Sequence, residues 1–177
     1  MSSSLLLSAV GGDGTTIATS FQFVAGRFRH AIELSNPDGG IVDRWDDEAQ
    51  SDNDDWPASP PIQQLSLESI HGAPTLLGVG QAGKSHWSIS VESSTLDSKP
   101  ALKFDLACRC RAQPFWLGST YQRSHIMGDK APILRMINVA SLKPIVSETL
   151  AISCVCDPAA ITKYPGTFRW SYLIAAG

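Results

Sequence analysis

The residues from Gly78 to Ser85 match two nucleotide-binding patterns. Gly78, Gly83, Lys84 and Ser85 fit G-x-x-x-x-G-K-[ST], and Gly78, Gly80 and Gly83 fit G-x-G-x-x-G. In both patterns a glycine-rich turn directs backbone N–H groups at phosphate oxygens, and the helix that follows adds the positive end of its dipole. The match therefore indicates phosphate binding only if a helix begins after Ser85.

The sequence after Ser85 is typical of a strand. Trp87, Ile89 and Val91 alternate with polar residues, which is the period of a strand with one buried face. We therefore interpret the glycines as part of a hairpin or a bulged strand connection. The enzyme-class alternative is a P-loop nucleotide-binding hydrolase, in which the lysine and serine of the pattern contact phosphate and magnesium.

Four cysteines form two C-x-C pairs, Cys108 with Cys110 and Cys154 with Cys156. On a strand, the members of each pair share one face. We interpret them as reduced core residues, because free cysteine is among the most buried residue types. If the two strands were neighbours, four thiolates could converge on zinc, although structural zinc sites usually have C-x₂₋₄-C spacing. A small metal-binding β protein is thus another alternative, and disulfides are a third reading of these residues.

Acidic residues are concentrated in residues 43–61. Between Asp43 and Asp55, seven acidic residues and one arginine give a charge of −6, so the rest of the chain carries +3. The stretch ends in Trp56-Pro57 and Pro60-Pro61. This composition predicts a long exposed surface loop.

The acidic loop supplies most of the candidate binding residues. A tryptophan in a charged loop is either anchored on the body of the protein or available to a partner. Carboxylates suit calcium, but the order of an EF-hand loop is absent, which favours a solvated loop. The candidate ligand-binding or partner-binding residues are Trp45, Trp56, Asp52, Asp54 and Asp55, together with Arg109 and Arg111.

Basic residues recur at outward positions of the expected strands. Arg27, Arg29, Lys103, Arg109 and Arg111 would form a basic patch if their strands adjoin. The net charge of −3 and the pI near 5.7 argue against nucleic acid as the main partner. We expect this face to pair with the acidic loop of the chain or with another subunit.

Short strands must position these residues. The alternation is longest in 101–111, and the other expected strands are 5–10, 15–24, 27–34, 62–70, 75–79, 86–92, 115–121, 133–140, 150–156 and 167–174. A helix is expected only in short pieces, such as 157–162. About ten strands separated by turn signals predict one all-β domain, an antiparallel sandwich or barrel.

The composition indicates which classes of protein the chain can belong to. The 177 residues are 43% hydrophobic and 18% charged, which is typical of one globular domain. The chain has no secretory signal and no apolar run of about 20 residues, so we expect a cytoplasmic protein that does not enter membranes. We predict a non-enzymatic binding or assembly module without a cofactor. Its expected partner is another protein or a second copy of itself, and a small ligand is the alternative partner.

Overall fold

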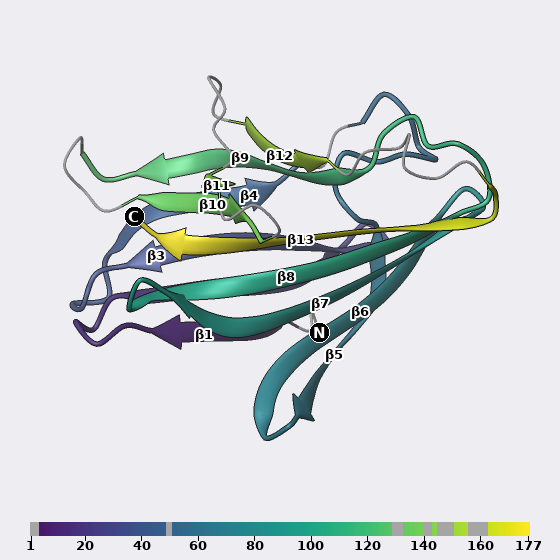
Figure 1. Ribbon diagram of the computed structural model, residues 1–177. Helices are drawn as coiled ribbons and strands as arrows, with labels where there is room; N and C mark the ends of the chain where they lie inside the picture. The colour runs from purple at the N-terminus through teal and green to yellow at the C-terminus, as the bar shows by residue number, and fades with distance from the viewer. Residues whose placement is uncertain (1–3, 49–50, 129–132, 140–142, 145–150, 156–162) are drawn as a thin grey trace.

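The computed structural model describes residues 4–48, 51–128, 133–139 and 163–177, and the backbone of 143–144 and 151–155. The strands run antiparallel in two sheets that pack face to face. Figure 1 shows β13, β8 and β7 lying in front of the strands of the other sheet. The expected all-β fold is therefore confirmed, as a sandwich.

The first sheet has six strands, in the order β1-β2-β3-β4-β9-β12. Their bounds are β1 Ser4–Val10, β2 Thr16–Val24, β3 Arg27–Ser35, β4 Ile41–Asp47, β9 Gly118–Ile126 and β12 Ala151–Val155. β2 and β3 form the expected hairpin, and positive φ angles at Ala25 and Gly26 make its two-residue turn.

The second sheet has seven strands, in the order β11-β10-β13-β8-β7-β6-β5. Their bounds are β5 Ile62–Ile70, β6 Ala73–Ala82, β7 Ser85–Leu96, β8 Lys99–Cys110, β10 Leu134–Asn138, β11 Lys143–Pro144 and β13 Gly166–Ala176. The segment from β5 to β8 is a meander of three hairpins.

The core lies between the two sheets and follows the alternation of the sequence. The inward residues of β8 include Phe104 and Leu106, and those of β7 include Trp87 and Ile89. The Phe104 ring stacks on Tyr172 of β13, with centroids 5.0 Å apart. The opposite faces of these strands remain accessible, so the second sheet presents a solvated outer surface.

One strand was not expected from the sequence, and the expected start of another is wrong. Residues 43–47, expected in the acidic loop, belong to β4, and the loop begins only after Asp47. The strand expected from Phe115 starts instead at Gly118, and the Phe115 side chain is 79% exposed. The piece 157–162, expected as a short helix, lies outside the described residues.

Candidate functional site

The glycines of the phosphate-loop pattern belong to a β-hairpin. Gly78 and Gly80 lie in β6, Gly83 lies in the turn, and β7 begins directly at Ser85. The P-loop alternative is therefore wrong, because a strand stands where its helix is required. Packing explains two of the glycines. A β-carbon on Gly80 would overlap the backbone of Pro61, and one on Gly78 would lie 2.8 Å from methyl groups of Ile62 and Ile89.

The cysteines that the structure describes are core residues. Cys108 and Cys110 are fully buried on the inner face of β8, with their sulfur atoms 3.4 Å apart. Burial raises the pKa of the Cys110 thiol. Cys154 lies in β12 of the other sheet, and Cys156 lies outside the described residues. The strands that carry Cys108 and Cys154 thus belong to different sheets and are not hydrogen-bonded to each other. The side chain of Cys154 also lies outside the described residues, so the zinc alternative stays a prediction.

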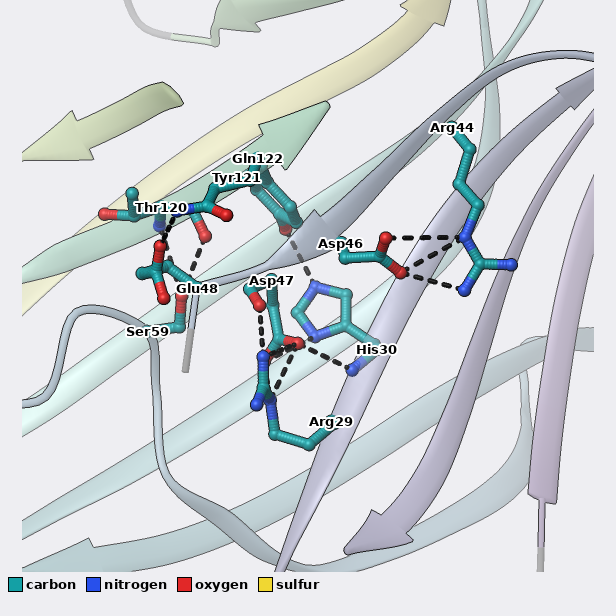
Figure 2. Close-up of polar contacts among 10 residues, drawn as sticks. All are labelled: Arg29, His30, Arg44, Asp46, Asp47, Glu48, Ser59, Thr120, Tyr121 and Gln122. Atoms are coloured by element: carbon teal, nitrogen blue, oxygen red, sulfur yellow. Dashed lines mark hydrogen bonds and ion pairs between the residues drawn. The ribbon is translucent and has the colours of Figure 1, made fainter. Parts of the chain in front are cut away.

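Asp46 and Asp47 of β4 both take part in ion pairs, Asp46 with Arg44 of the same strand and Asp47 with Arg29 of β3. The carboxylate of Asp47, which is 6% exposed, pairs with the Arg29 guanidinium at 2.8–3.0 Å and accepts a hydrogen bond from the backbone N–H of His30. Figure 2 shows the Arg29 side chain reaching this carboxylate. Arg44 pairs with Asp46 and Glu33 nearer the surface. Five residues of the expected loop are thereby fixed in a sheet.

A chain of buried polar side chains continues from Asp47 into the core. The His30 Nδ1 lies 3.8 Å from Asp47 Oδ2, and its Nε2 shares a 2.9 Å hydrogen bond with the hydroxyl of Tyr121 (Figure 2). Tyr121 in turn shares a 2.7 Å hydrogen bond with Tyr172. Burial lowers the pKa of His30, and the nearby Asp47 charge opposes that shift. These side chains are arranged like a proton relay, but they are buried between the sheets, where a substrate would not reach them. We therefore interpret them as hydrogen bonds that hold β3, β9 and β13 together.

The remainder of the loop is attached to the sandwich at several points. The Ser59 hydroxyl donates to the Thr120 carbonyl at 2.9 Å, and the Glu48 carboxylate accepts from the Gln122 amide (Figure 2). Trp56 is partly buried, and its ring packs edge-on against Trp87, with centroids 6.0 Å apart. Trp45 is only 1% exposed in β4, so it is a core residue and its indole is not accessible to a partner.

The accessible hollow with the most distinctive charge lies on the outer face of the second sheet. We call it the basic groove. It has a volume of about 520 Å³ and is lined by Gln63, Gln64, Val79, Gly80, Gln81, His86, Trp87, Ser88, Ala107, Arg109, Thr167 and Arg169. A continuation of about 580 Å³ shares five of these residues and adds Ser66, Leu77, Ser90 and Asp105, among others. The whole surface crosses five strands, from β5 to β13.

Strand register brings the basic residues of the basic groove together. His86 of β7 lies directly opposite Arg109 of β8. Arg169 of β13 lies opposite Ala107, which is two residues from Arg109 on the same face. Neighbouring side chains on one face of a sheet are about 5–8 Å apart. Two guanidinium groups and an imidazole are thus held close together on one surface.

These basic residues have no acidic counterpart in the described part of the chain. No described residue lining the basic groove is an aspartate or glutamate, and neither Arg109 nor Arg169 makes an ion pair with a described residue. Asp105 in the continuation is already engaged by Lys103 at 2.8 Å and by Ser171. Its hydrogen bond is the main cause that raises the pKa of Lys103. The groove therefore offers positive charge to a ligand.

A second hollow lies at the end of the sandwich, next to the basic groove. This end pocket has a volume of about 540 Å³ and is lined by Asp55, Trp56, Ala82, Lys84, Ser85, Arg111, Ala112 and Gln113. It brings together residues from the acidic loop (Asp55 and Trp56), from the phosphate-loop pattern (Lys84 and Ser85) and from the expected basic patch (Arg111). Its cations, Lys84 and Arg111, are exposed and extend the positive surface beyond the end of β8.

The predicted site residues are only partly assembled. Arg109 lines the basic groove, whereas Asp55, Trp56 and Arg111 line the end pocket. Asp52 and Asp54 are exposed in the loop and line neither hollow. The expected basic patch is divided, because Arg27 and Arg29 belong to the first sheet and Lys103 and Arg109 to the second, while Arg111 lies just beyond the end of β8.

Sequence reasoning missed His86 and Arg169 as partners of Arg109. Both stand at outward positions of alternating strands, which is the signal that could have marked them. Arg169 lies near Arg109, however, only because β13 pairs with β8, and these segments are about 60 residues apart in the sequence. Alternation alone does not reveal that pairing.

Comparison with protein-family models, with curated proteins and with solved structures found no match to this chain. Within the described ranges, no helix is long and apolar enough to cross a membrane.

Proposed function

We propose that the protein is a non-enzymatic binding module whose basic groove holds an extended acidic segment of a protein partner. One observation carries the proposal: Arg109, Arg169 and His86 adjoin on one open face, and no acidic residue in the described part of the chain lines the groove with them. Arg109 and Arg169 are diagonal neighbours on adjacent strands, within reach of each other for long side chains, so their like charges repel. An anionic ligand would compensate that repulsion.

The chemistry of the groove suits carboxylates. A guanidinium group can donate two parallel hydrogen bonds to one carboxylate, which adds orientation to charge attraction. The Gln64 amide can bind the backbone of an extended chain, whereas the Gln63 amide bonds the backbone of Gln81 and the Gln81 amide donates to the Gly83 carbonyl. Five strands spaced about 4.8 Å apart span about 19 Å, the length of about six extended residues. The shallow shape matches a peptide that lies on the surface.

The lining favours a peptide over a single-stranded nucleic acid. Bases of single-stranded nucleic acids are usually held by aromatic stacking. The only aromatic residue that lines the groove among the described residues is Trp87, and its side chain is buried in the core. The net charge of −3 would also repel a long polyanion outside the groove.

Fluorescence anisotropy with labelled peptides tests the proposal. Hexaglutamate should bind and hexaglutamine should not, with affinity falling as salt rises, since exposed charge pairs are screened. Arg109→Gln and Arg169→Gln should each weaken binding up to about five-fold, the effect of an exposed ion pair worth about 1 kcal/mol. Lys99→Gln, at the opposite end of β8, is the matched control.

Two outcomes would overturn the proposal. One is equal binding of the two peptides, and the other is an equal loss of affinity in Lys99→Gln and Arg109→Gln. A single-stranded oligonucleotide of the same charge is included as a third ligand. Tighter binding of that oligonucleotide than of hexaglutamate would assign the groove to nucleic acid instead.

A further inference from the structure

β5 is an unpaired edge of the second sheet. Among the strands that the structure describes, the order ends at β5, which pairs with β6 on one side and with no described strand on the other. An edge strand presents a row of N–H and C=O groups that another strand can bind, and proteins usually blunt such edges with lysine, proline or bulges. A register shift between Ile62 and Gln64 marks an irregularity at the first end of β5, but from Gln64 to Ile70 the pairing with β6 is regular. The strand contains neither lysine nor proline, and Glu68 is its single charge.

Apolar side chains of β5 are left uncovered. Leu67 lies opposite Leu76, which is fully buried, yet Leu67 itself is 45% exposed. Ile70 is 41% exposed at the end of the same strand. Figure 1 shows why: the β5–β6 hairpin extends beyond β1, at the bottom of the view. A long edge with exposed leucine and isoleucine has the features of an interface.

The sequence of β5 is nearly symmetric about Ser66. The strand reads Ile-Gln-Gln-Leu-Ser-Leu-Glu-Ser-Ile from 62 to 70. Leu65 and Leu67 flank the centre, Gln64 and Glu68 follow, and isoleucine stands four residues away on each side. The other long edge strand, β1, has no such symmetry: about Leu7 it pairs Leu6 with Ser8 and Leu5 with Ala9. In a two-fold interface residue i contacts residue j and j contacts i, so a two-fold axis at Ser66 would place each residue of β5 opposite one of similar size and polarity.

We propose that two copies of this chain associate through antiparallel pairing of their β5 strands, with a two-fold axis at Ser66. Leu65 of one copy then lies opposite Leu67 of its partner, and Gln64 lies opposite Glu68. Apolar groups meet apolar groups, and each carboxylate meets an amide that can donate to it. No two like charges are directly opposite, an arrangement that would weaken a sheet.

The association would also join two binding surfaces. Gln64 and Ser66 of β5 line the continuation of the basic groove, so the grooves of the two copies would adjoin across the axis. A partner with two acidic segments would then bind with an effective concentration set by its linker. This consequence rests on the proposed function, whereas the pairing of β5 does not.

Cross-linking at the axis is the first test. Residues directly opposite in an antiparallel pair have Cα atoms about 4.5–5.5 Å apart, within the range of a disulfide. Under mild oxidation, Ser66→Cys should form a reducible dimer of twice the 19.0 kDa chain mass. Ser69→Cys is the matched control, because residue 69 would face Gln63 of the partner. Cross-linking of Ser66→Cys no greater than that of Ser69→Cys or the parent protein would overturn the proposal.

The second test places charges at the two-fold axis and measures dimerisation by sedimentation equilibrium. Circular dichroism verifies that each variant is folded. Ser66→Lys and Ser66→Glu each place two like charges opposite one another, so each should dimerise at least about ten-fold more weakly than the parent. An equimolar mixture should recover dimers, because lysine then faces glutamate. A mixture no tighter than the single variants would overturn the two-fold pairing.

The association and the proposed function can fail separately. A parent protein that stays monomeric at the highest concentration tested, yet binds hexaglutamate, would reject the β5 dimer alone. A protein that dimerises through β5 but does not bind hexaglutamate would reject only the proposed function of the basic groove.

Discussion

The Asp43 carboxylate of β4 accepts a hydrogen bond from the backbone N–H of Leu134 in β10, at 2.8 Å, and thereby connects the two sheets. Asp43 is fully buried. Arg123 of β9 compensates its charge: Nη2 donates to Oδ2 at 3.1 Å, while Nε lies 3.0 Å from Oδ1 at an angle too poor for a hydrogen bond. Arg123 also lies over the Trp45 ring, 5.7 Å from its centroid.

Removing the buried carboxylate should therefore be costly. Asp43→Ala leaves the Arg123 charge uncompensated and one buried N–H without its acceptor, and breaking a buried pair in this way costs about 3–5 kcal/mol. Urea unfolding would measure the loss. The control is Asp46→Ala, because Asp46 pairs with Arg44 at the surface and should cost at most about 1 kcal/mol. Equal midpoints for the two variants would contradict the structural role of Asp43.

His30 should make the protein sensitive to mild acid. Burial lowers the pKa of the folded His30 below its usual value of 6.5. At a pH between the pKa of His30 in the folded chain and its pKa in the unfolded chain, the unfolded chain binds a proton that the folded chain does not. The contribution of neutral His30 to stability is therefore complete above about pH 6.5 and declines as the pH falls through that window, by at most about 1.4 kcal/mol per pH unit.

The pH effect can be isolated by comparing variants between pH 5 and 8. His30→Gln should lose this part of the slope in the free energy of unfolding, whereas His125→Gln, at an exposed position, should keep it. An unchanged slope in His30→Gln would assign the acid sensitivity to other groups.

Gly80 should be required for packing. A β-carbon there meets the backbone oxygen of Pro61, which cannot move as a side chain can. We expect Gly80→Ala to lower the free energy of unfolding by about 1–3 kcal/mol through overpacking. Gly12→Ala is the control, since nothing lies within 4 Å of its β-carbon, and it should change stability by no more than about 0.5 kcal/mol. Similar melting temperatures for the two variants would refute the packing explanation.

The thiols of Cys108 and Cys110 should be unreactive in the folded protein. Both side chains are fully buried, and burial raises the pKa of Cys110, which keeps the reactive thiolate scarce. Iodoacetamide followed by peptide mapping should find both residues unmodified in buffer and alkylated in urea. Comparable alkylation of the native protein would show that this part of the core opens readily.

The fold could be predicted from the sequence because its strands carry the alternation of a half-buried sheet. β4 is the exception, and its failure has a physical cause. Asp43 and Asp47 are acceptable in the interior only because Arg123 and Arg29 compensate them, and those partners are 80 and 18 residues away. Composition shows the charges but not their partners, so a strand was interpreted as a solvated loop.

The candidate site was less accessible to prediction for a related reason. The sequence predicts that Arg109 faces outward, but it does not place His86 and Arg169 beside it. The groove exists only because β7, β8 and β13 adjoin in a particular register. A one-residue shift in that register would turn Arg169 toward the core.

Hydrogen bonds between the sheets lie toward one side of the sandwich. Besides Asp43 with Leu134, β9 is bonded to β13 twice, through Tyr121 with Tyr172 and through Ser119 with Trp170 at 3.3 Å. β1 lies on the other side, against β7 and β8. We therefore expect the two sheets to separate first on the side of β1, while β9 and β13 hold them together on the other side. Amide hydrogen exchange would register that motion first in β1 and β5, at the loose margin.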